Sequence, residues 1–153
     1  MGRLYSASFD AVAVSAVQDL FEVSAPADAV VVVHSVWVGQ TSDAGDAQAE
    51  MLRVTIERAA TSGSLGTTPT ARPLEVGDPA FGGVVEANNT TRAGTLTLLQ
   101  SLPFNVQAGL FYQPTPEERI VISPSGILVV GLPAAPADSL TMSGTIIFEE
   151  VGG

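Results

Sequence analysis

The feature that most constrains this chain is a period-two alternation of apolar and polar residues, which recurs along most of its length. It is clearest over residues 140–148, where Leu140, Met142, Ile146 and Phe148 alternate with smaller or polar side chains. Residues two apart lie on the same face of a β-strand, so this pattern is typical of strands with one buried face. No segment shows the spacing of a long amphipathic helix. The sequence therefore predicts an all-β protein.

Turn-forming residues divide this pattern into about eight or nine predicted strands. They cover residues 5–13, 17–24, 30–38, 50–58, 95–100, 104–112, 119–123, 127–132 and 139–151. In segment 50–58 the better register places Leu52, Val54 and Ile56 inside and Arg53, Thr55 and Glu57 outside. A helix over residues 47–58 is the alternative, because that stretch also contains good helix formers.

The strongest strand signal is residues 30–38, which begin with four consecutive valines. Such a run is disfavoured in a helix and suits a strand that is covered on both faces. The segment contains Trp37, the single tryptophan of the chain. We predict that Trp37 is an anchor of the core, because large aromatic side chains dominate core packing.

The chain has the size of one domain, and numerous strands separated by turns favour a two-sheet β-sandwich. We predict a single domain over residues 1–153, with the jelly roll as the preferred topology. Residues 1–14 are expected to form an N-terminal arm or an edge strand that pairs with a neighbouring subunit. Residues 60–89 are rich in Gly, Pro, Ser and Thr and read as a long excursion, which makes them the best candidate for an interaction surface.

Composition limits the classes of partner. The formal net charge is -10, and all 6 basic residues are arginines. Such a chain repels phosphate backbones and anionic membranes, so we expect neither nucleic acid nor a membrane as partner. Hydrophobic residues make up 46% of the chain and charged residues 14%, which favours burial of surface against a partner or a second copy. The N-terminus lacks the pattern of a secretory signal, so we expect synthesis in the cytoplasm.

Few residues offer catalytic or metal chemistry, and we expect no enzyme, no cofactor and no metal centre. The chain has no cysteine and a single histidine, His34, whose apolar neighbours indicate a hydrogen-bonded residue within a sheet. The pairs Glu117–Glu118 and Glu149–Glu150 point to opposite faces of a strand and read as solvated edges. The loop from Asp43 to Glu50 gathers acids as a calcium loop does, but it lacks the EF-hand spacing, so an ordinary turn is preferred to a cation site.

Several segments carry a resemblance to a known group of proteins. Residues 116–126 (PEERIVISPSG), 132–138 (LPAAPAD) and 143–150 (SGTIIFEE) resemble small bacteriophage virion proteins of the capsid decoration, or cement, type. Residues 40–43 (QTSD) and 86–91 (EANNTT) look similar too. The resemblance covers most of the chain from Val30 onward. It implies a β-sandwich on the capsid exterior, commonly a homotrimer, that binds the major capsid protein.

Two other functions remain open at this point. A carbohydrate- or receptor-binding sandwich of a phage fibre or tail tip would need an exposed aromatic platform, and Phe81, Phe111 and Tyr112 are the aromatic residues to test. A carboxylate enzyme would need a second acid near Glu118 or Glu149, which the sequence does not place there.

Overall fold

The computed structural model describes residues 2–41 and 50–152 of the chain. These residues form eleven β-strands and one short 3₁₀ helix, with no α-helix among them. The elements are β1 (Arg3–Val14), β2 (Gln18–Ser24), β3 (Ala29–Gln40), β4 (Met51–Ala59), β5 (Arg72–Pro73), β6 (Val84–Asn89), β7 (Thr97–Asn105), β8 (Leu110–Tyr112), η1 (Pro116–Glu118), β9 (Val121–Ile122), β10 (Ile127–Leu132) and β11 (Leu140–Gly152). The all-β prediction is confirmed.

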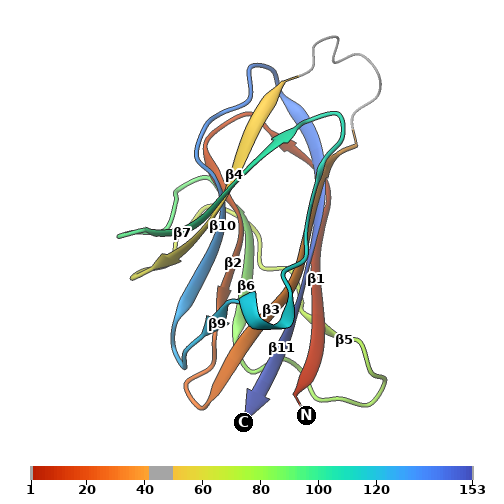
Figure 1. The fold of residues 1–153 in the computed structure, drawn as a ribbon, viewed down its shortest axis with the longest axis vertical. Coiled ribbons are helices and arrows are strands. Elements are labelled where there is room, and N and C mark those ends of the chain that lie inside the picture. The colour runs from red at the N-terminus through yellow and green to blue at the C-terminus, as the bar shows by residue number, and fades with distance from the viewer. Residues whose placement is uncertain (1, 42–49, 153) are drawn as a thin grey trace.

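The strands form two antiparallel sheets that pack face to face (Figure 1). Sheet A has the order β5-β1-β11-β3-β8, and β9 also pairs with β3, while sheet B has the order β6-β2-β10-β4-β7. The pairs β1–β11, β2–β10, β3–β8 and β4–β7 nest one inside the next along the chain. This nested pairing across two sheets is the jelly-roll arrangement, so the preferred topology is confirmed.

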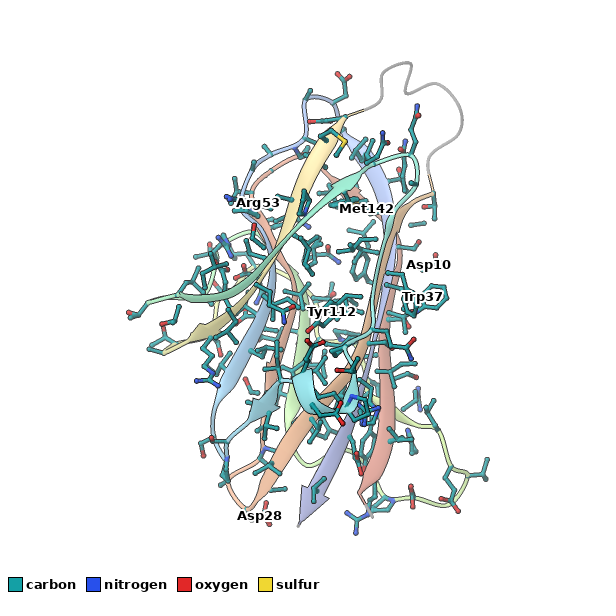
Figure 2. The ribbon with its side chains drawn as sticks, viewed as in Figure 1. Asp10, Asp28, Trp37, Arg53, Tyr112 and Met142 are labelled. Atoms are coloured by element: carbon teal, nitrogen blue, oxygen red, sulfur yellow. The ribbon has the colours of Figure 1, made fainter. Side chains whose placement is uncertain are left out.

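The core lies between the sheets and consists of the inward-facing residues of both (Figure 2). In β11 the inner positions are occupied by Leu140, Met142, Ile146 and Phe148, all 0% exposed, as the alternation predicts. In β4 Leu52, Val54 and Ile56 face the core, which confirms the strand and its register and rules out the helix over residues 47–58. One predicted strand was wrong in extent: residues 104–112 divide into the end of β7, a turn, and β8.

The excursion predicted for residues 60–89 closes one edge of the sandwich. Its β5 extends sheet A by pairing with Tyr5 and Ser6 of β1, and its β6 extends sheet B by pairing with β2. Between these two strands, the ring of Phe81 packs against Tyr5 and Phe148 at centroid distances of 5.4 and 4.8 Å. The excursion is therefore held by both sheets.

Candidate binding surfaces

The outer face of sheet A carries an exposed aromatic pair. Trp37 of β3 and Phe111 of β8 are cross-strand partners, 54% and 51% exposed, with ring centroids 4.4 Å apart. Figure 2 shows Trp37 pointing away from the sandwich, whereas Met142 points between the sheets. The prediction that Trp37 is a core anchor is therefore wrong.

A β-bulge in β3 explains this error. Val33 pairs with Phe148 and Ser35 with Ile147, so His34 is one extra residue opposite a regular β11. An extra residue reverses the alternation beyond it. Val31 and Val33 face the core before the bulge, and Val36 and Val38 face it afterwards. Trp37 therefore points outward, although strict alternation from Val33 would bury it.

A second bulge lies in the neighbouring part of β1. Phe9 pairs with Gly144 and Val12 with Met142, which leaves one extra residue in β1 at Asp10 and Ala11. Ala11 has a positive φ of 50°, and its N–H donates to the Ser143 hydroxyl at 2.9 Å. That hydroxyl donates in turn to Asp10 Oδ1 at 2.7 Å. Asp10 lies on the outer face of sheet A by alternation from Phe9, and the bulge brings the Ala11 N–H and the Ser143 hydroxyl together beside its carboxylate.

The two bulges flank an open hollow of about 600 Å³, which we call the aromatic hollow. Trp37 and Phe111 form one side of it, and the opposite side is polar. The polar side holds Asp10 with Ser143, and Ser8, whose hydroxyl lies 2.8 Å from that of Thr145. Gly39 contributes bare backbone between them, and a Cβ added there would meet no atom within 4 Å. Flat aromatic surface and fixed hydrogen-bonding groups thus share one hollow.

A second hollow, of about 400 Å³, lies near the other end of the same face and is lined by Leu4, His34, Leu74 and Glu149 among others. His34 Nε2 lies 3.0 Å from Glu149 Oε2, which confirms that the histidine is hydrogen-bonded within a sheet. Glu149 also accepts a hydrogen bond from the Gly2 N–H at 2.9 Å. The side chains of His34 and Glu149 are therefore already engaged with one another or with backbone.

The prediction that Glu149 and Glu150 are both solvated is wrong for Glu150. The two carboxylates do point to opposite faces, but Glu150 is only 4% exposed. It accepts a hydrogen bond from the Gly82 N–H at 2.9 Å and forms an ion pair with Arg3 at 3.6 Å. The excursion covers this end of β11, so the inner carboxylate is buried instead of solvated.

An exposed turn within the excursion, residues 74–79, carries two exposed apolar side chains, and we call it the apolar tip. Leu74 is 52% exposed and Val76 is 102% exposed. The tip is nevertheless fixed on both sides, because Leu74 N–H donates to Leu4 O at 2.8 Å and Tyr5 Oη donates to Pro79 O at 3.0 Å. A turn at Gly77, with a φ of 106°, lies between these two anchors. Apolar side chains are thus held in water on an anchored turn.

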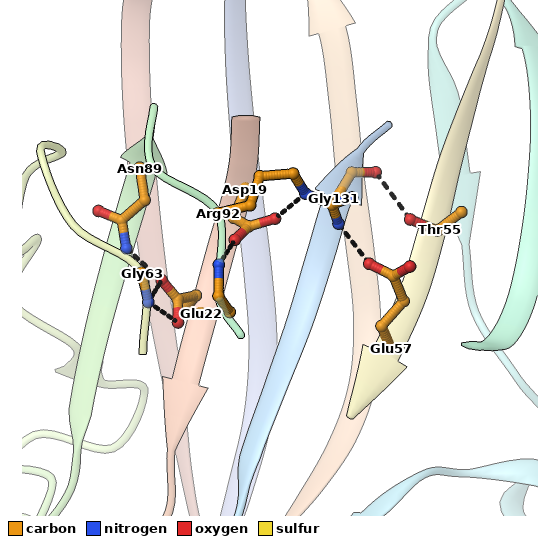
Figure 3. Close-up of polar contacts among 9 residues, drawn as sticks. Asp19, Glu22, Thr55, Glu57, Gly63, Asn89, Arg92 and Gly131 are labelled. Atoms are coloured by element: carbon orange, nitrogen blue, oxygen red, sulfur yellow. Dashed lines mark hydrogen bonds and ion pairs between the residues drawn. The ribbon is translucent and has the colours of Figure 1, made fainter. Parts of the chain in front are cut away.

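Part of the outer face of sheet B is covered by the excursion and by Arg92 and Ala93, which follow it, and Figure 3 shows the polar contacts that hold this cover. The guanidinium of Arg92 lies across Gly131 of β10 and joins Asp19 of β2 to Glu57 of β4. Asp19 Oδ1 accepts from Arg92 Nε at 2.6 Å, and Asp19 Oδ2 accepts from the Ala93 N–H, also at 2.6 Å. Burial nevertheless raises the pKa of Asp19 above its usual value.

Beside this ion pair, the carboxylate of Glu22 accepts from the Gly63 N–H at 3.0 Å and from the Asn89 side chain. Asn89 also donates to Glu86 Oε2 at 3.0 Å. Burial is the main cause that raises the pKa of Glu22. Thr55 and Glu57 were placed on the outer face, as predicted, but both are buried there because the excursion covers them. These groups fasten the excursion to sheet B and are not accessible to a ligand.

The other residues singled out from the sequence do not converge. Glu117 and Glu118 lie exposed in η1, where Glu118 Oε2 accepts from Thr115 Oγ1 at 3.2 Å. Phe81 and Tyr112 are half-buried and pack on the core, whereas Phe111 is 51% exposed. Within residues 2–41 and 50–152, no group of three or more acids and histidines is placed to hold a metal ion. The loop from Asp43 to Glu50 lies outside the described residues except for Glu50, whose Oε1 accepts from the Ala137 N–H at 2.8 Å.

Comparisons with known proteins add little. No protein-family model matches the chain, and no curated protein matches it. Among solved structures, it is similar to a chain of the "Structure of infectious bursal disease virus Gx strain", with 17% sequence identity and a TM-score of 0.20. That match covers 99% of this chain and 41% of the other, so this chain spans about two fifths of its length. A likeness of this size carries no argument about function. In the part of the chain that the structure describes, no helix is long and apolar enough to cross a membrane.

Proposed function

We propose that the protein is a structural component of a bacteriophage virion, made in the host cytoplasm, which decorates the capsid exterior. In this proposal it binds the major capsid protein and cements neighbouring subunits as a homo-oligomer, most simply a homotrimer. Its role is binding without a catalytic step. Hydrolytic activity that Glu118→Gln abolishes would contradict this.

The sequence resemblance supports the proposal, and its segments occupy connected parts of the fold. Residues 116–126 form η1, β9 and the turn into β10, residues 132–138 lead from β10 into β11, and residues 143–150 lie in β11. β11 is a central strand of sheet A. The jelly roll is also a fold that serves in viral capsid and lectin domains, which makes it compatible with the role without specifying it.

The observation that carries the proposal is the anchored apolar tip. A loop that exposes Leu74 and Val76 loses the favourable burial of apolar surface, about 25 cal/mol for each Å² left in water. A mobile loop could fold such side chains inward, but hydrogen bonds at both ends fix this one. Rigid presentation of apolar side chains is what a protein–protein contact requires, because little ordering entropy is then lost on docking. We assign the capsid contact to this tip.

Self-association is assigned to the free edge of β1. Within the described residues, β5 pairs only with Tyr5 and Ser6, so β1 beyond Ser6 has no partner strand on that side. An unpaired strand edge is a template for strand addition by a second chain. This keeps residues 1–14 as the proposed contact between subunits.

Co-sedimentation with capsid shells assembled from the phage major capsid protein tests the tip. Wild-type protein is expected to sediment with the shells, and Val76→Asp to lose this association with an unchanged melting temperature. Leu98→Asp is the matched control, because Leu98 is also apolar and 55% exposed but lies on β7, in the other sheet. If wild-type protein fails to bind the shells, or if Val76→Asp and Leu98→Asp bind equally well, the proposal is wrong.

Light scattering across a concentration series tests self-association independently. A mass of three chains is expected, and a protein that remains at 15.7 kDa at high concentration contradicts the homotrimer. Ser8→Pro removes one N–H from the free edge and should shift the equilibrium toward monomer.

A further inference from the structure

We propose that the aromatic hollow on the outer face of sheet A binds a neutral carbohydrate, with one pyranose ring stacked on Trp37. This goes beyond capsid decoration, which is assigned to the excursion tip and the edge of β1. The hollow is lined by residues of β1, β3, β8 and β11, by Thr41, and by the turn that leads into β8. Its volume of about 600 Å³ lies within the range of small-molecule sites.

The aromatic side of the hollow supplies the apolar half of this recognition. Trp37 is 54% exposed although it is the largest side chain in the molecule, and Phe111 holds its ring from the next strand at a tilt of 56°. The faces of a sugar ring that carry C–H groups are apolar and flat. They suit an aromatic platform, which presents a large rigid surface at little cost in conformational entropy.

The polar side supplies hydrogen-bonding groups of both kinds. Asp10 offers carboxylate oxygens as acceptors, and its Oδ1 is oriented by the Ser143 hydroxyl at 2.7 Å. The hydroxyls of Ser8 and Thr145, 2.8 Å apart, each can donate and accept. Because these groups are already fixed by one another and by the Ala11 N–H, few rotamers are lost when a ligand binds.

Charge narrows the class of ligand further. Among the described residues that line the hollow there is no arginine, lysine or histidine, and the one charged group is the Asp10 carboxylate. A phosphorylated, sulfated or sialylated ligand would meet that negative charge in a protein of net charge -10. A purely apolar ligand would instead remove water from Asp10 without replacing its hydrogen bonds. A neutral polyhydroxyl compound with an apolar face satisfies both sides.

Two irregularities of the backbone build this hollow. The bulge at His34 turns Trp37 outward, and at the bulge of Asp10 and Ala11 the Ser143 hydroxyl holds the Asp10 carboxylate on the same face. Bulges are frequent where a strand redirects a side chain beside a functional site. Gly39 completes the hollow by leaving its centre empty. The space is therefore formed by the fold and needs no movement to open.

The single tryptophan makes the test direct, because fluorescence excited selectively in tryptophan reports on Trp37 alone. We would screen the purified protein on an array that carries neutral and sialylated glycans. Maltohexaose, cellohexaose and N-acetylchitohexaose would then be titrated while the emission is followed. The expected result is a saturable blue shift with at least one neutral glycan, with a dissociation constant between about 10 μM and 1 mM.

Three variants make the outcome specific. Phe111→Ala keeps the reporter and should weaken binding about tenfold. Asp10→Asn should weaken it while leaving the stacking surface intact. Gly39→Leu should abolish it by filling the hollow, without loss of stability, because an added side chain meets open space. Leu98→Ala, on the other sheet, is the control that should bind as the wild type does.

Each result decides the proposal. Binding to no neutral glycan on the array overturns it, and so does binding that is confined to sialylated glycans or survives Gly39→Leu. If Gly39→Leu and Phe111→Ala lose binding to capsid shells instead of glycan, the hollow is a protein contact. Loss of shell binding in Val76→Asp alone leaves the carbohydrate site standing, so the two proposals fail separately.

Discussion

The outer faces of the two sheets differ in how far they are covered, although both belong to the same sandwich. Part of the face of sheet B is covered by the chain's own excursion and by Arg92, just beyond it, which forms ion pairs with Asp19 and Glu57. The face of sheet A is left open and presents Trp37 beside Asp10 (Figure 2). One face therefore contributes to stability, and the other is available for recognition. The difference shows that a strand's outward residues cannot be assigned to solvent until the long connections are placed.

The largest expected effect lies in the covered face. Arg92→Ala removes the cation between two carboxylates, of which Asp19 is 0% exposed. Breaking a buried ion pair from one side leaves an uncompensated charge and costs about 3–5 kcal/mol. Urea denaturation should show this loss, whereas Arg53→Ala, an exposed arginine on β4, should stay within about 0.5 kcal/mol of wild type. Equal stability of the two variants would mean that Arg92 does not fasten the excursion.

Matched glycines in the two faces give the next largest effect. A Cβ at Gly131 would clash with the Arg92 guanidinium and displace it from Glu57, whereas a Cβ at Gly39 meets nothing. Gly131→Ala should therefore lower stability by about 1–3 kcal/mol. Gly39→Ala should be neutral or stabilising by about 0.5 kcal/mol, because glycine weakens a strand interior. Thermal unfolding of the two variants in parallel measures the difference in stability between them. Equal stability would mean that the Arg92 side chain moves aside without cost.

Substitutions on the open face should lower the free energy of unfolding only slightly. Trp37→Ala loses the ring contact with Phe111 and part of its buried surface, about 1 kcal/mol. Phe148→Ala, in the core at 0% exposure, should cost about 3–5 kcal/mol. Denaturant midpoints with unchanged slopes would check this. A Trp37→Ala loss as large as that of Phe148→Ala would show that Trp37 supports the fold.

The smallest expected effect concerns pH. Because burial raises the pKa of Glu22 in the folded state, the folded protein holds that proton more tightly than the unfolded chain. Glu22 therefore makes its most favourable contribution below the unfolded pKa, and this is lost as pH rises through the folded pKa. Glu22→Gln should flatten the fall in stability between acidic and neutral pH. Melting temperatures of both proteins across that range test it, and parallel curves would contradict it.

Much of the sandwich was predictable from local pattern. The alternation in β11 placed Leu140, Met142, Ile146 and Phe148 in the core, and the register of β4 was correct. What failed depends on contacts that local pattern does not contain. Glu57 and Glu150 are buried because segments distant in sequence cover them. In β2, Asp19 and Glu22 stand on either side of Leu20 and Phe21, and all four are buried. Two adjacent large apolar residues cannot both face the core in a regular strand, and this was the available signal that the outer face of β2 is covered.

The candidate site was missed for a different reason. Phe111 was correctly singled out, but Trp37 was assigned to the core because large aromatic side chains dominate core packing. The sequence around His34 contains no glycine or proline that would mark a bulge. The one available signal was the sequence Val36-Trp37-Val38, in which two β-branched residues compete with the tryptophan for the inner face. The hollow also includes a second bulge in a different strand, β1, at Asp10 and Ala11.

The extra residue at His34 also determines how this surface can change by mutation. Deleting its codon in frame would remove the bulge but leave the pairs Val33–Phe148 and Ser35–Ile147 in place, so that Trp37 would still point outward and Val36 and Val38 inward. The bulge absorbs the extra residue, and the side chains beyond it keep the faces that their pairing with β11 gives them. The aromatic surface of the open face should therefore survive the loss of one residue at this point of the strand.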